Sequence, residues 1–85
     1  MKALIGKNVL IRTVTTYHVG RLDSVENKFA RLAEASWVAD TGRFGVALAS
    51  GKLSEVERFV DDVFVNVGAI VDVTEWAHPL PSTSK

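Results

Sequence analysis

The pattern of apolar and polar positions divides the chain into extended stretches with one helical segment among them. A β-branched run beginning at Asn8 and a second run at 17–25 predict two strands that fold back on each other. The reversal must lie within 13–16, although no Gly, Asn or Asp marks it. Gly20 lies inside the second run, where a glycine costs stability unless the strand bends sharply or another backbone comes close. The pattern therefore predicts a sheet that is strongly bent at Gly20.

The middle of the chain continues the sheet and then changes to a helix. After a polar turn at 26–28 we expect a third strand at 29–38, although the alanine-rich centre of this stretch is also compatible with a helix. Asp40 has the chemistry of a helix N-cap and Gly51 that of a C-cap. A short helix is therefore predicted at 41–50.

The last third of the chain is again apolar and β-branched. The stretch at 53–60 alternates only in part, and stronger strands are predicted at 63–67 and 69–76, with Gly68 between them. Residues 78–85 hold both prolines and are expected to form a flexible tail. The predicted fold is mostly β: five antiparallel strands in one domain at 1–77, with one short helix between the third and fourth strands.

Composition narrows the classes of protein that this chain can belong to. With 47% hydrophobic and 24% charged residues it should fold, and its 10 basic and 10 acidic residues give no net field to attract nucleic acid or an acidic membrane. The absence of cysteine excludes disulfides, thiolate metal sites and a cysteine nucleophile. No apolar run approaches the ~18 residues of a membrane span, and the first residues do not resemble a signal peptide. We therefore expect a soluble, cytoplasmic protein.

The side chains that carry chemistry are few and scattered. His18 and His78 lie sixty residues apart, and neither has a second ligand at the spacing that metal sites favour. We expect His18 to be partly buried and hydrogen-bonded in its strand. Asp61 and Asp62 are adjacent, so on a strand they would face opposite sides, and a polar turn explains them better. The sequence thus predicts a non-enzymatic protein with no catalytic residue, cofactor or metal.

Three stretches resemble motifs of the Sm-like family, which comprises the Sm, LSm and bacterial Hfq proteins. GRLDSVE at 20–26 is similar to the first motif, where a Gly-x-Leu pair on a bent second strand precedes a hydrophobic and an acidic residue. LAEA at 32–35 is similar to the end of the third strand, and VNVGAIVDV at 65–73 to the second motif, in which two short strands meet at a glycine turn. The resemblance implies a small, strongly bent five-stranded Sm-like barrel in which the predicted helix is an insertion.

The resemblance also implies a homo-oligomeric ring of six or seven copies. In such rings each subunit adds its fourth strand to the fifth strand of its neighbour, which removes the two free edges of an open sheet. The residues expected at this contact are the apolar ones of the last two strands, Val63, Phe64, Val65, Ile70, Val71 and Val73. The alternative is that both strands are central strands of a monomer.

Single-stranded RNA is the partner that the resemblance implies. Family members stack a base on one side chain and hydrogen-bond its edge with an Asn held by an acidic residue. By position the stacking group is Phe29 and the acidic group is Glu26, whereas Ala30 and Val67 occupy the places of the family's Asn and Arg. Arg21, Lys28 and Arg31 are the expected phosphate contacts, and Gly68 belongs to the second motif.

An alternative makes Phe29 a core residue and the neighbouring charges a solvated face. The chain would then be a structural or protein-interaction ring without a role in nucleic-acid binding, with the helix as the surface for its partner.

Overall fold

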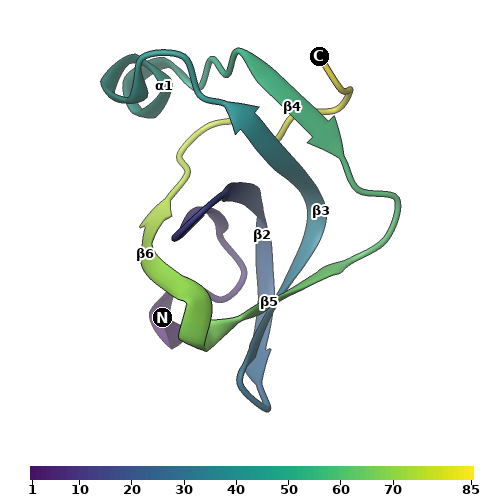
Figure 1. Cartoon of the computed structure of the whole chain (residues 1–85). Helices are drawn as coiled ribbons and strands as arrows, with labels where there is room; N and C mark the ends of the chain where they lie inside the picture. Colours follow the sequence, from purple (N-terminus) through teal and green to yellow (C-terminus); the bar gives the residue numbers. More distant parts are fainter.

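All 85 residues are described by the computed structural model, in which six antiparallel strands form one sheet (Figure 1). The strands are β1 (Asn8–Thr13), β2 (Tyr17–Glu26), β3 (Phe29–Asp40), β4 (Glu55–Arg58), β5 (Val63–Asn66) and β6 (Ile70–Glu75). Helix α1 (Phe44–Ser50) follows β3, and the 3-10 turns η1 (Lys2–Leu4) and η2 (Val67–Ala69) precede β1 and β6. The strand order is β4-β3-β2-β1-β6, with β5 also paired to β3. The predicted mostly β fold is confirmed, and the alanine-rich stretch is a strand.

Threonine side chains close the reversal between β1 and β2. The hydroxyl of Thr13 accepts a hydrogen bond from the Thr16 backbone N–H at 3.0 Å. The Thr13 backbone N–H donates to the Thr16 carbonyl at 2.8 Å. A hydroxyl that bonds the local backbone stabilises a turn without glycine or asparagine. The predicted position of the reversal is confirmed.

The bend in the sheet lies where Gly20 faces a bulge in β3. The register between β2 and β3 shifts here, so Glu34 and Ala35 together lie opposite Gly20. Glu34 has φ 49°, in the left-handed region. A Cβ atom on Gly20 would lie 3.1 Å from both the Ala33 carbonyl oxygen and the Ala35 Cα. The predicted close approach of another backbone at Gly20 is confirmed.

The predicted bent antiparallel sheet is confirmed, but it has six strands instead of five and is not closed into a barrel. The stretch at 53–60 contributes a strand of its own, β4, which pairs with the second half of β3, while β5 pairs with the first half. Strands β5 and β6 follow each other through η2 without pairing, so the sheet is not a closed barrel. The separation of β4 from β5 has a physical reason in the bulge of the twelve-residue β3. One straight partner strand cannot follow both halves of a bent strand.

Helix α1 is shorter at its start than predicted. It begins at Phe44, and Asp40 is not its N-cap. Asp40 is the last residue of β3, and its carboxylate accepts a hydrogen bond from the Gly42 backbone N–H at 2.7 Å. Gly51 is confirmed as the C-cap, with φ 76° and an N–H that donates to the Ala47 carbonyl at 2.8 Å.

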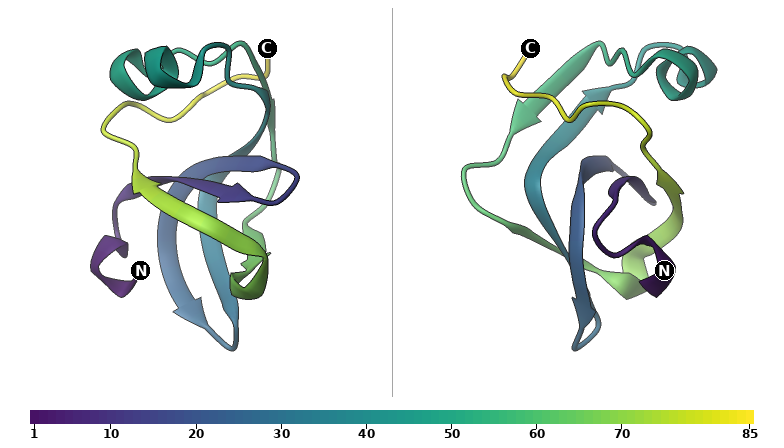
Figure 2. Two further views of the ribbon diagram at one scale, coloured as in Figure 1. Left: turned by 60° about the vertical axis from the view of Figure 1, so that its left-hand side comes forward. Right: turned by 180° about the vertical axis from the view of Figure 1, so that it is seen from behind.

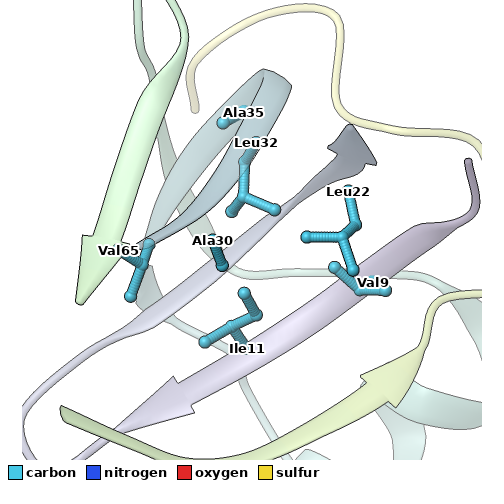
Figure 3. Close-up of a cluster of buried hydrophobic side chains, with 7 residues drawn as sticks. All are labelled: Val9, Ile11, Leu22, Ala30, Leu32, Ala35 and Val65. Atoms are coloured by element: carbon cyan, nitrogen blue, oxygen red, sulfur yellow. The ribbon is translucent and has the colours of Figure 1, made fainter. Parts of the chain in front are cut away.

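Two clusters of buried apolar side chains share strand β1. Figure 3 shows the first cluster, which consists of Val9, Ile11, Leu22, Ala30, Leu32, Ala35 and Val65. The second consists of Leu10, Val19, Val38, Ala47, Leu53, Val56 and Trp76. Since successive residues of a strand face opposite sides, β1 is buried on both of its faces.

Residues 77–85 form neither helix nor strand, yet they follow a defined path across the molecule. Figure 2 shows this tail in yellow, leaving β6, passing α1 and ending beside β4. There the backbones of Val56 and Lys85 exchange two hydrogen bonds, of 2.7 and 2.9 Å. The flexibility of the tail stays a prediction. None of the helices has the length and apolar character needed to cross a membrane.

Candidate functional site

The tight turn between β2 and β3 gathers the predicted RNA-binding residues at one end of the sheet. Asn27 and Lys28 have φ 50° and 69°, so these two residues reverse the chain, and Glu26 pairs with Phe29 across the turn. The Lys28 carbonyl accepts a hydrogen bond from the backbone N–H of Val67 at 2.9 Å. This contact places η2, which contains Gly68, beside the turn.

A cleft of about 230 Å³ lies on the outer face of the sheet at this end. Its lining residues are Ser24, Glu26, Asn27, Phe29, Arg31 and Phe64. Ala30 lies between Phe29 and Arg31 on β3, so its side chain points to the opposite face of the sheet, where it is fully buried. Phe29 is 41% exposed and Phe64 60% exposed, so neither ring belongs to the core. The cleft thus presents two aromatic rings and several polar groups to solvent.

Phe64, expected from the sequence at a subunit contact, also lines this cleft, a place that the sequence pattern did not predict. Phe64 on β5 is the cross-strand partner of Arg31 on β3, and the guanidinium carbon lies 6.0 Å from the centre of the Phe64 ring. The alternation in VFVN does place Phe64 on the face opposite to Val63 and Val65. That pattern indicates the outer face, but only the pairing of β5 with β3 brings the ring to Arg31.

The positive charge of Arg31 is already paired with a carboxylate. Its Nε and Nη2 atoms lie 2.8 and 2.6 Å from the same Asp62 oxygen. Glu26 adds a second negative charge to the cleft, while Lys28 makes no ion pair. The cleft therefore has no net positive charge as it stands.

Arg21, another expected phosphate contact, lies outside the cleft and is also paired. Its Nε donates to Asp23 at 2.9 Å and its Nη1 to Glu34 at 2.7 Å. The hydrogen bond to Asp23 raises the pKa of Arg21 above its ordinary value, because the charged form is the donor. Arg21 thus links β2 to the bulge in β3 through Glu34, and its charge is already paired.

The residues predicted for a subunit contact divide into buried and exposed groups. Val65 is only 6% exposed and belongs to the first core cluster, against which Val63, Ile70 and Val73 pack. The other two are exposed: Val71 on β6 to 54% and Phe64 on β5 to 60%. Strand β5 pairs only with β3, and β6 only with β1, so each has one edge without a partner. The backbone edges and two side chains are thus available for association.

The two histidines lie in different surroundings. His18 is half-buried, and burial lowers its pKa below the ordinary value of 6.5. Its ring stacks on Phe59 with centres 6.0 Å apart, but its Nδ1 has no hydrogen-bond partner, contrary to the prediction for this residue. The Nε2 atom of His78 lies 2.7 Å from the Leu48 carbonyl oxygen. No group of three side chains is placed to hold a metal ion.

No protein-family model matches the chain, and no curated protein matches it either. The choice of function therefore depends on the cleft and on the free strand edges.

Proposed function

We propose that this chain is a non-enzymatic, Sm-like module that assembles with copies of itself into a ring and binds single-stranded RNA in the cleft at Phe29. The observation that carries the proposal is the pair of exposed rings, Phe29 and Phe64, with the Arg31 guanidinium beside them. Stacking a base on an aromatic ring contributes about 1–3 kcal/mol and tolerates any base. Two rings in one cleft offer two stacking surfaces.

Polar groups around these rings fit the edges and the backbone of a splayed nucleotide. Ser24, Glu26 and Asn27 line the cleft and supply donors and acceptors for base edges. Lys28, unpaired and exposed at the tip of the turn, supplies a positive charge for phosphate. Ala30 is buried, so the edge contacts of this module differ from those of the family that it resembles.

The free edges of β5 and β6 support self-association. An exposed edge strand with apolar side chains and no blocking Lys or Pro tends to pair with another strand. Pairing β5 of one copy with β6 of the next would satisfy both edges, and repetition around an axis closes a ring. Phe64 belongs to both β5 and the cleft, so this contact would set the cleft close to the neighbouring copy.

A protein-interaction ring without RNA is the second candidate, and the charge of the cleft favours it. The Arg31–Asp62 ion pair and Glu26 leave the cleft without the positive field that usually attracts a polyanion. The net charge of the chain is zero as well.

The test is a titration of labelled single-stranded oligouridine at low and at moderate salt. The wild type should bind with an affinity that falls as salt rises. Phe29→Ala and Phe64→Ala should each weaken binding about tenfold or more, since each removes one stacking surface. Phe59→Ala is the matched control, because Phe59 is exposed but lies outside the cleft. Absence of binding at low salt would overturn the RNA proposal in favour of the second candidate.

A native mass spectrum at micromolar concentration tests the ring separately. Six or seven copies of the 9.3 kDa chain would give a species of roughly 56 to 65 kDa. A monomer under these conditions would contradict both candidates.

A further inference from the structure

The C-terminal tail is held to the body of the protein by contacts spread along its length. At its start, the Nε2 atom of His78 lies 2.7 Å from the Leu48 carbonyl at the end of α1. The Asn8 side-chain amide donates to the His78 carbonyl at 3.2 Å. Further on, the side chain of Leu80 packs against the second core cluster. The middle of the tail therefore has an apolar anchor.

The end of the tail lies along β4 as an added strand would. Val56 and Lys85 donate to each other's carbonyls at 2.7 and 2.9 Å, which is the pattern of a hydrogen-bonded antiparallel pair. The Arg58 backbone N–H donates to the Ser84 hydroxyl at 2.9 Å, and the Arg58 guanidinium donates to the Pro81 carbonyl at 2.7 Å. The tail thus covers an edge of the sheet that would otherwise be free.

These contacts are separated by open space. A cleft of about 340 Å³ beside the Arg58–Pro81 contact is lined by Asn8 and Glu34 of the body and by Leu80 and Ser82 of the tail. Another of about 260 Å³ is lined by Gly51, Leu53 and the tail. Residues 82–85 are exposed. A segment held at a few points, with an exposed end, can leave its site without disturbing the rest of the fold.

We propose that the β4 edge, together with the apolar site that holds Leu80, is a docking surface for the C-terminal tail of a second copy of this chain. Main-chain hydrogen bonds at a sheet edge, combined with a pocket for one side chain, form the strand-addition mode of peptide recognition. Each copy carries the same tail, so exchange between two copies preserves every contact described above. This surface is separate from the edges of β5 and β6, and the proposal requires neither the ring nor RNA.

The chain's own tail competes for this surface. A short tether gives it an effective concentration in the millimolar range, so an incoming tail meets a site that is mostly occupied. Weakening the anchor of the chain's own tail should therefore expose the site. The apparent affinity for a tail added in solution then rises with the fraction of empty sites.

The experiment uses a labelled peptide of residues 77–85, titrated into the full-length protein and followed by fluorescence anisotropy. Full-length Leu80→Asp should bind the peptide about tenfold tighter than wild type, because its own tail loses the apolar anchor. Ser82→Ala is the matched control, since Ser82 is exposed and makes no hydrogen bond, and it should behave as wild type. A peptide that itself carries Leu80→Asp should not bind.

A second variant and a second measurement cover the case in which Leu80→Asp does not fold. Lys85→Pro removes the N–H that pairs with Val56 and touches no buried side chain, so its circular dichroism spectrum should match that of wild type. In this variant the Val56 amide should exchange faster with solvent, and added peptide should slow the exchange again. Equal peptide affinity in all variants, or peptide binding that leaves Val56 exchange unchanged, would overturn the proposal.

Discussion

Gly20 on β2 faces Ala35 on β3 so closely that a Cβ atom on the glycine would lie 3.1 Å from the Ala35 Cα. Gly20→Ala should therefore lower the free energy of unfolding by about 1–3 kcal/mol, because an added methyl group meets backbone that cannot rotate away. Gly45→Ala is the matched control. Nothing lies within 4 Å of the methyl group that it adds, and Gly45 is in α1, so this change should stabilise by up to about 1 kcal/mol. Urea unfolding of both variants checks the pair, and equal effects would contradict the close approach.

The half-buried His18 should make stability depend on pH. Its pKa is lowered by burial in the folded protein, while the unfolded chain takes up a proton near the ordinary value of 6.5. Between these two pKa values the unfolded state binds more protons, so the free energy of unfolding falls as pH falls below 6.5. His18→Gln should remove this part of the pH dependence. Urea unfolding of both proteins between about pH 8 and about pH 5 measures it, and parallel curves would show that His18 does not contribute.

Releasing Arg31 from its carboxylate should strengthen RNA binding. Asp62→Asn removes the charge that holds the guanidinium, so Arg31 becomes free to contact phosphate. We expect oligouridine affinity to rise about two- to tenfold, and the salt dependence to steepen by about one phosphate contact. Asp61→Asn makes the same change of net charge without touching Arg31. If both variants bind equally well, the gain is a general charge effect and the assignment of Arg31 is wrong.

A lysine on the free edge of β6 should prevent self-association. Val71→Lys places a charge where the proposed contact excludes water, and Val71 is already 54% exposed in the single chain. The assembly should dissociate, while the free energy of unfolding of the monomer changes by no more than about 0.5 kcal/mol. Val60→Lys is the control, since Val60 is 99% exposed in the loop between β4 and β5. Light scattering after gel filtration would report the masses, and an intact assembly in Val71→Lys would place the contact elsewhere.

Features that depend on a few neighbouring residues could be predicted from the sequence. The hairpin of β1 and β2, the close approach at Gly20 and the C-cap at Gly51 all follow from local backbone preferences. Asp40 shows the limit of such rules. Its side chain bonds a backbone N–H two residues on, as turn residues do, and the helix begins only after that turn.

Features that depend on pairing across the sheet could not be predicted. The separation of β4 from β5 follows from the bulge in β3, and a bulge has no reliable mark in a single sequence. Phe64 reaches Arg31 only through the register of β5 against β3. The path of the tail depends on contacts such as that between Val56 and Lys85, whereas its composition is that of a loop.

Strand β1 contributes Val9 and Ile11 to one core cluster and Leu10 to the other. Because β1 lies in both clusters, withdrawing this strand from the sheet would open both at once. The two clusters should therefore unfold in one cooperative transition, and the backbone amides of β1 should be among the last to exchange with solvent. A substitution at Leu10 would then loosen both halves of the protein, including the end of the sheet that carries the cleft.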